Sequence, residues 1–232
     1  MDMPAYWLRR PDLRRDGDTL AAVDQLVARA LEQGPGHCID YRLDLPKWQF
    51  LSHVAERAGL VLHGSGDPAI ARFEPRQPDD PLEFSNRRAV FAAADGLWPM
   101  YYAVLDRERH PMMLVNSCVR LASQTGGLSD PFYYFSISDT ALQQKPWRQG
   151  TVYLLPASSF EAQPPLVAGF GDTQVHVAQA ASPVPVEPLA KLAVGPEDFP
   201  FLDRIRGHRD EDLQARIAAD PDGFPWVVPT AP

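Results

Sequence analysis

Residues 89–105 read AVFAAADGLWPMYYAVL, and this stretch decides the fold class. Its first five residues are apolar, which is typical of a strand that is buried on both faces. Pro99 then occupies the first turn of a helix, where its missing N–H leaves no hydrogen bond unmade. Tyr101 to Leu105 continue the helix with apolar and aromatic side chains. The stretch therefore predicts one strand-to-helix step.

Helices dominate the chain before this step. Residues 19–33 carry apolar side chains at helical spacing before a Gly-Pro-Gly stop, and a second helix is predicted from Pro46 to Gly59. Short strands are predicted at 38–43 and 60–63. The N-terminal part is thus expected to be mainly helical.

Strands dominate after the step. They are predicted at 112–119, 132–137, 151–155, 174–178 and 189–194, and a helix at 202–219 precedes a tail at 221–232. Helices first and strands afterwards predict an α+β domain around mainly antiparallel strands. The chain length fits one packed domain. Its parts would be an N-terminal helical elaboration (1–59), a core (60–200) and a C-terminal helix with its tail (201–232).

The composition is that of a globular protein, with 45% hydrophobic and 22% charged residues. A net charge of −8 argues against a nucleic-acid surface, which needs excess positive charge, but it permits a local pocket for a phosphate-bearing small molecule.

Met1 is followed by charged residues, and no apolar run reaches about 18 residues. We therefore expect no signal peptide, no membrane span and a cytoplasmic location. Cys38 and Cys118 lack zinc-site spacing, so we expect reduced cysteines and no metal.

Several catalytic motifs are missing from the sequence. Ser65 follows His63 and Gly64, so it lacks the glycine two positions earlier that a nucleophile elbow requires. The chain has no Gly-x-x-x-x-Gly-Lys-Ser/Thr phosphate loop and no His-Glu-x-x-His pair. A serine hydrolase and a zinc enzyme are therefore not expected.

The remaining candidate chemistry lies in one ordered string of elements. Leu62-His63-Gly64-Ser65 ends a predicted strand, and the strand at 89–93 and its helix follow a polar loop. This string resembles the first two motifs of the ADP-ribosyltransferase superfamily, in particular its poly(ADP-ribose) polymerase-like branch. That branch has His-Gly-Ser/Thr at the end of the first core strand, then a Tyr-Phe-Ala-like strand and a helix that carries a tyrosine.

The resemblance implies a split β-sheet that binds NAD or another ADP-ribose compound. His63 and Ser65 would hydrogen-bond ribose hydroxyls, and Gly64 would let its backbone approach the nicotinamide carboxamide. Tyr102 is favoured to stack on the cationic nicotinamide ring, and the Arg76 guanidinium would meet the diphosphate. The predicted binding residues are His63, Gly64, Ser65, Arg76, Phe91, Tyr101 and Tyr102.

Each of these residues also has a purely structural interpretation. A histidine after three apolar residues fits a hydrogen-bonded core histidine. At least one of Tyr101 and Tyr102 fits helical core packing. Arg76 fits a loop charge that pairs with Asp79 or Asp80.

The third motif of the family is a glutamate on a later strand, which stabilises the cationic transition state as nicotinamide leaves. The corresponding region of this chain has Gln179, with Glu161 and Glu187 as other carboxylates nearby in sequence. A neutral amide supplies no negative charge. We therefore predict an NAD- or ADP-ribose-binding protein with weak or absent catalysis; an active form would be an ADP-ribosyltransferase or an NAD glycohydrolase.

Two alternatives remain from the sequence. One is a non-catalytic interaction module with the same fold. The other is an NAD-dependent RNA 2′-phosphotransferase-like enzyme, which would carry a basic RNA-binding surface that the acidic charge of this chain disfavours. The acceptor of any ADP-ribose, whether protein or other, is not indicated.

Overall fold

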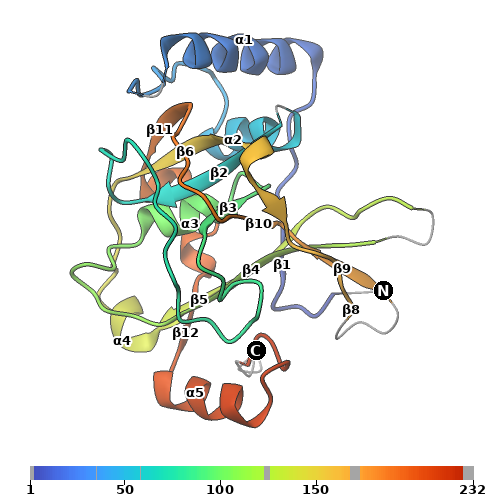
Figure 1. Cartoon of the computed structure of the whole chain (residues 1–232), viewed down its shortest axis with the longest axis vertical. Helices are drawn as coiled ribbons and strands as arrows, with labels where there is room; N and C mark the ends of the chain where they lie inside the picture. The colour runs from blue at the N-terminus through green and yellow to red at the C-terminus, as the bar shows by residue number, and fades with distance from the viewer. Residues whose placement is uncertain (1–2, 35, 58, 123–125, 168–172, 227–232) are drawn as a thin grey trace.

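The computed structural model describes residues 3–34, 36–57, 59–122, 126–167 and 173–226. In this part of the chain, the strands form two six-stranded sheets (Figure 1). The first sheet has the order β1-β5-β4-β9-β8, with β12 beside β5. The second sheet has the order β11-β6-β2-β3-β10-β7. Every named strand pair is antiparallel except β5 with β12, so the predicted α+β class with mainly antiparallel strands is confirmed.

The bounds of the elements are as follows. The first sheet contains β1 (Leu8–Arg9), β4 (Leu114–Leu121), β5 (Phe132–Ser138), β8 (Leu166–Val167), β9 (Gln174–Val177) and β12 (Arg206–His208). The second contains β2 (Leu60–Ser65), β3 (Val90–Ala93), β6 (Gly150–Pro156), β7 (Glu161–Ala162), β10 (Gln179–Ser182) and β11 (Ala190–Val194). The helices are α1 (Gly17–Gln33), α2 (Lys47–Arg57), α3 (Trp98–Val104), α4 (Asp139–Leu142) and α5 (Asp210–Ala219), and short 3-10 turns lie at Ala157–Ser159, Pro196–Asp198 and Leu202–Arg204.

The N-terminal helices form where the sequence predicts them. Asp16 caps α1, because its carboxylate accepts a hydrogen bond from the Thr19 N–H at 2.9 Å. One face of α1 is buried through Val23, Leu26, Val27 and Ala30. A positive φ of 60° at Gly59 follows α2, as expected of a glycine after a helix end.

One large core joins the N-terminal helices, both sheets and the segment near Phe199. Helix α3 lies in this core and packs on β2 and β6, between the two sheets (Figure 1). A smaller core lies on the other face of the first sheet, where Val115 and Val119 meet Leu213 of α5. The N-terminal helices thus pack against the second sheet, and α5 packs against the first.

The chain passes from the first sheet to the second at Ala178. The Ala178 N–H donates to the Cys118 carbonyl of β4, and the Ala178 carbonyl accepts from Ala94 N–H, which follows β3; both distances are 2.9 Å. Strand β9 before Ala178 pairs in the first sheet, and β10 after it pairs in the second. The two sheets are thus joined by backbone at this residue.

The predicted neighbourhood of β2 and β3 is confirmed. The two strands pair at Leu62 and Ala93, with β6 on the other side of β2. Strands predicted at 112–119, 132–137, 151–155, 174–178 and 189–194 all form, with shifts of one or two residues at some ends.

Two sequence predictions are wrong. The strand at 38–43 does not form, because only Cys38 makes a bridge, to Lys191, while Asp40 and Arg42 pair with each other in solvent. The helix at 202–219 begins only at Asp210. The first half of the predicted helix contains the strand β12 instead. A Cβ on Gly207 would lie 1.8 Å from Asp139 Oδ1 of α4. The glycine therefore lets the backbone of β12 run close beside α4. The last part of the predicted tail, 227–232, lies outside the described residues.

Cys38 and Cys118 are both free thiols. Within the described ranges, no helix is both long enough and apolar enough to cross a membrane.

Candidate functional site

His63 lies near the end of β2, where β2 and β3 separate. Leu62 and Ala93 form the only registered pair between these strands, so the strands diverge beyond it. The imidazole reaches across the opening, and its Nδ1 lies 2.6 Å from the Phe91 carbonyl oxygen. Since a carbonyl only accepts, Nδ1 carries the proton. The ring also packs against Phe73, with centroids 4.6 Å apart.

The environment keeps His63 uncharged. Burial lowers the pKa of this imidazole, and the positive charges of Arg107 and Arg76 lower it further, against the effect of the hydrogen bond to Phe91. In the neutral ring, Nε2 is a hydrogen-bond acceptor. Nε2 has no hydrogen-bond partner within the described chain and is not a buried atom there. It is therefore free to accept a hydrogen bond from a ligand hydroxyl.

Two arginines, Arg76 and Arg107, lie close enough to His63 to influence its charge. Both side chains are exposed, and neither makes an ion pair with a carboxylate in the part of the chain that the structure describes. The expected pairing of Arg76 with Asp79 or Asp80 is thus not formed there. The Arg107 guanidinium lies 5.8 Å from the centroid of the Tyr102 ring. Both guanidinium groups thus add positive charge near His63.

Gly64 is required for packing against α3. A Cβ at this position would lie 1.7 Å from the Pro99 carbonyl oxygen and 3.1 Å from the Ala103 nitrogen. The helix backbone therefore occupies the space beside the Gly64 Cα. The hydroxyl of Ser65 accepts from the Asp67 N–H at 3.1 Å, which leaves its own proton available to a ligand.

The two tyrosines of α3 have different environments. Tyr101 is fully buried, donates to the Ser136 carbonyl at 2.9 Å and stacks on Phe135, so it is a core residue. Tyr102 is half-buried and donates to Asn116 Oδ1 at 2.7 Å. Burial raises the pKa of Tyr102 to about 12, so its hydroxyl stays protonated. Of the two tyrosines, only Tyr102 is partly exposed.

Asn116 fixes this part of α3 to the first sheet. Its Oδ1 accepts from both Tyr102 Oη and Trp98 Nε1, the latter at 2.6 Å. Trp98 and Tyr102 are one helical turn apart, so a single amide on β4 orients two aromatic rings. Neither Asn116 nor Arg107 was singled out from the sequence. Only the tertiary structure brings them to Tyr102, and no motif marks them.

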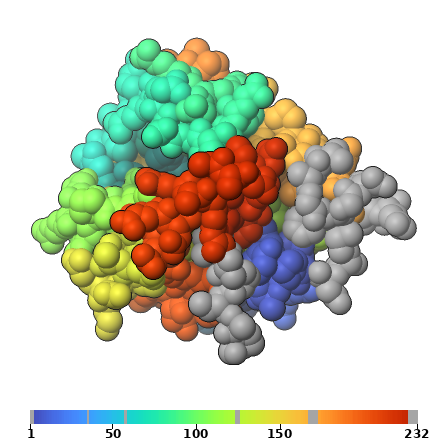
Figure 2. Space-filling model, turned by 90° about the horizontal axis from the view of Figure 1, so that it is seen from below, coloured from blue at the N-terminus to red at the C-terminus, as the bar shows by residue number. Residues whose placement is uncertain are grey.

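The loop at 67–88 connects β2 to β3 and runs along the second sheet. Phe73 pairs with Val186, and Arg76 pairs with Ala89, so the first part of the loop is held by backbone hydrogen bonds. Leu82 packs on the core near α5. Figure 2 shows this teal and green segment beside the red C-terminal segment on one face of the molecule.

Gln179 begins β10, which pairs with β3 on the side away from β2. Gln179 and Leu62 both pair with Ala93, so β3 lies between His63 and Gln179. Their backbones are two strand spacings apart, about 10 Å. The Gln179 Oε1 accepts from Ser85 Oγ of the loop at 3.0 Å. The described contacts do not bring Gln179 and His63 together directly.

The two carboxylates considered as alternatives lie in different settings. Glu161, on β7, pairs with Arg87 at 2.7 Å and is exposed. This ion pair and hydrogen bond lower the pKa of Glu161, so it is charged. Glu187 is an exposed residue between β10 and β11.

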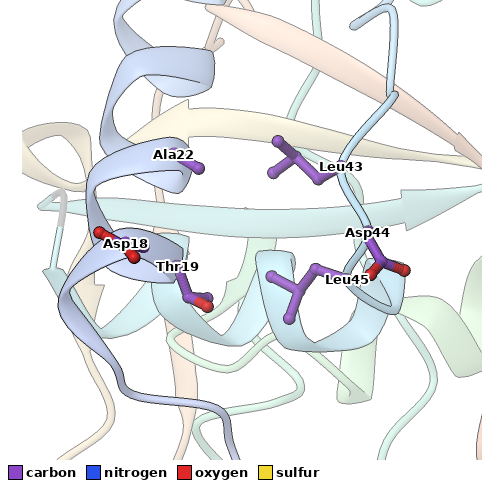
Figure 3. Close-up of a pocket in the computed structure, with 6 residues that line it drawn as sticks. All are labelled: Asp18, Thr19, Ala22, Leu43, Asp44 and Leu45. Atoms are coloured by element: carbon purple, nitrogen blue, oxygen red, sulfur yellow. The ribbon is translucent and has the colours of Figure 1, made fainter.

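Two surface cavities lie outside these residues. The smaller, about 180 Å³, lies between the start of α1 and the segment 43–45 (Figure 3). Asp18 and Asp44 are its charged groups, and an acidic residue in a first helical turn stabilises the helix by itself. The larger cavity, about 320 Å³, lies where the two sheets meet at Ala178.

Among the described residues, no group of three or more His, Cys, Asp or Glu side chains is arranged to hold a metal ion. Comparisons with protein-family models, with curated proteins and with solved structures found no match to this chain.

Proposed function

We propose that this chain is an ADP-ribosyltransferase-like protein that binds NAD or another ADP-ribose compound beside His63 and cleaves it weakly or not at all. The proposal rests on the order of the motifs in the sequence and on the chemistry of the residues around His63. The contact between His63 Nδ1 and the Phe91 carbonyl is the observation that carries it.

That contact gives His63 the form that a ribose ligand needs. With Nδ1 protonated and the ring neutral, Nε2 accepts a hydrogen bond from a ribose hydroxyl. The Ser65 hydroxyl, two residues further along β2, offers a second polar contact. A neutral histidine also avoids adding charge where the ligand is uncharged.

The arginines and Tyr102 match the other parts of the ligand. Arg76 and Arg107 are unpaired in the described chain and flank His63, so a diphosphate would find two guanidinium groups nearby. The half-buried ring of Tyr102, fixed by Asn116, can stack on a planar base or on nicotinamide. We assign the ligand contacts to His63, Ser65, Arg76, Tyr102 and Arg107.

Weak catalysis follows from the residue at position 179. A cation develops on the ribose when nicotinamide leaves, and a carboxylate stabilises that cation more than the ground state. Gln179 has the shape of a glutamate without its charge. Glu161 is the nearby carboxylate considered as a substitute for that charge. Its ion pair with Arg87 reduces the effect of Glu161 on a distant cation.

A ligand screen on the whole chain tests the proposal. NAD, ADP-ribose and nicotinamide are each added at a few millimolar, and the melting temperature is recorded. A ligand that binds only the folded state raises it by mass action. We expect shifts with NAD and ADP-ribose. The absence of a shift with all three would contradict the proposal.

A further inference from the structure

The larger cavity is lined by β4 and β9 of the first sheet, by α2, by Leu128 and by the residues that join the two sheets. It is lined by Glu56, Ala94, Arg120, Leu128, His176, Val177 and Ala178. None of the residues assigned to the His63 site is among them. Ala94 and Ala178 are joined by backbone at the point where the chain changes sheets, and their small side chains leave the space open. A volume of about 320 Å³ is at the lower end for small-molecule sites.

Two nitrogen-bearing side chains face the cavity side by side. Arg120 of β4 and His176 of β9 are direct cross-strand partners, so both project from the same face of the first sheet. Arg120 uses one N–H to bond the Ser129 carbonyl, at 3.2 Å. Most of its five guanidinium donors thus have no hydrogen-bond acceptor in the described residues.

The carboxylate in the cavity wall is already neutralised. Glu56 binds Arg10 and Arg15, and these two arginines help to lower the pKa of Glu56 against the effect of its burial. Arg120 Nη2 is 3.6 Å from Glu56 Oε1, which is too long for a hydrogen bond. Arg120 thus shares Glu56 with two other arginines, and Arg10 also pairs with Asp130. Three arginines meet two carboxylates in this ion-pair network, which leaves one positive charge in excess beside the cavity.

We propose that this cavity binds a small phosphate monoester, separately from the ligand at His63. A phosphate has three terminal oxygens, which the Arg120 fork and the His176 ring can share. Leu128 and Val177 supply an apolar surface for the organic part of the ester. A carboxylate has only two oxygens and would use the same donors less fully.

Isothermal titration calorimetry on the whole chain tests this site, with phenyl phosphate, inorganic phosphate and benzoate as probes. Phenyl phosphate is expected to bind most tightly, because it meets both the Arg120 guanidinium and the apolar wall. Arg120→Gln is expected to lower the affinity for phenyl phosphate about tenfold or more, since hydrogen bonds to a charged group are lost. The matched control is Arg29→Gln, at an exposed arginine of α1, which should leave binding unchanged.

A second variant covers the case in which Arg120→Gln disturbs the fold. Ala94 is exposed and lines the cavity, so Ala94→Leu fills space while it keeps every charge. This variant should also weaken the binding of phenyl phosphate. The proposal is overturned if wild type fails to bind phenyl phosphate at about 10 mM, if benzoate binds as tightly, or if both variants bind like wild type. Because the probes do not include NAD, failure of the proposed function would leave this test unaffected.

Discussion

His63 and Phe91 are joined across the opening between β2 and β3 by a 2.6 Å contact from Nδ1 to the carbonyl oxygen. This contact fixes both the orientation of the ring and its tautomer. It also explains how a half-buried histidine can be structural and available to a ligand at once, because each function uses a different nitrogen.

The first prediction concerns the protonation of His63. Long-range ¹H–¹⁵N spectra should show a neutral ring with the proton on Nδ1 at pH 7. Its pKa should lie below the ordinary value of 6.5, because burial and two arginine charges disfavour the cation. A ring protonated on Nε2 alone, or one that titrates above 6.5, would contradict the geometry on which the site is built.

The second prediction concerns Gly64. Gly64→Ala places a methyl group against the Pro99 carbonyl, and backbone cannot move aside easily. We expect the free energy of unfolding to fall by about 3 kcal/mol, the upper range for overpacking. Urea denaturation of wild type and Gly64→Ala measures this difference in the free energy of unfolding. Gly36→Ala is the control, because a Cβ at Gly36 has nothing within 4 Å and should change stability by less than about 0.5 kcal/mol.

Local patterns in the sequence were sufficient for much of the fold. The apolar run at Val90–Ala93 and the proline at the start of α3 depend only on neighbouring residues, and both were predicted correctly. The same local reasoning failed at β12. Residues 206–208 look compatible with a helix, but pairing with β5 and the close approach of Gly207 to α4 decide the structure.

The candidate site shows a similar division. His63, Ser65 and Tyr102 stand in a recognisable order along the chain. Arg107 and Asn116 reach Tyr102 only through folding, from a turn after α3 and from the first sheet, so no spacing in the sequence predicts them. The relation of Gln179 to Ala93 likewise depends on strand register, which a single sequence does not specify.

The third prediction concerns stability against pH. Burial lowers the pKa of His208 below its ordinary 6.5, with Asp210 and Asp139 acting in the opposite direction. Folding therefore favours the neutral ring. Its contribution to stability is full above pH 6.5 and is lost as the pH falls through the folded pKa. The melting temperature of wild type should fall between pH 7 and pH 5.

Substitution separates this effect from other groups. The His208 Nδ1 bonds Ser136 Oγ at 2.7 Å, so His208→Gln keeps a polar partner but cannot titrate. The drop in melting temperature between pH 7 and pH 5 should be smaller in this variant. His37→Gln, at an exposed histidine, should keep the full drop. An unchanged drop in His208→Gln would show that other groups cause it.

The fourth prediction concerns catalysis. Gln179→Glu keeps the acceptor for the Ser85 hydroxyl and adds a negative charge. If the reacting ribose lies over Gln179, nicotinamide release from NAD should rise by about a hundredfold, the usual effect of one preorganised electrostatic contact. Gln33→Glu adds the same charge at an exposed site on α1 and should have no effect. Robust turnover by wild type would mean that another carboxylate, such as Glu161, supplies the charge.

The central claim is that His63 binds an ADP-ribose compound. Isothermal titration calorimetry with ADP-ribose on wild type, His63→Ala and His37→Ala tests it most directly, with circular dichroism to verify that each variant is folded. We predict that His63→Ala weakens binding by about tenfold or more, since the hydrogen bond from the ligand to Nε2 is lost, and that His37→Ala binds like wild type. Equal affinity of folded His63→Ala and wild type, or no binding by wild type, would contradict the claim.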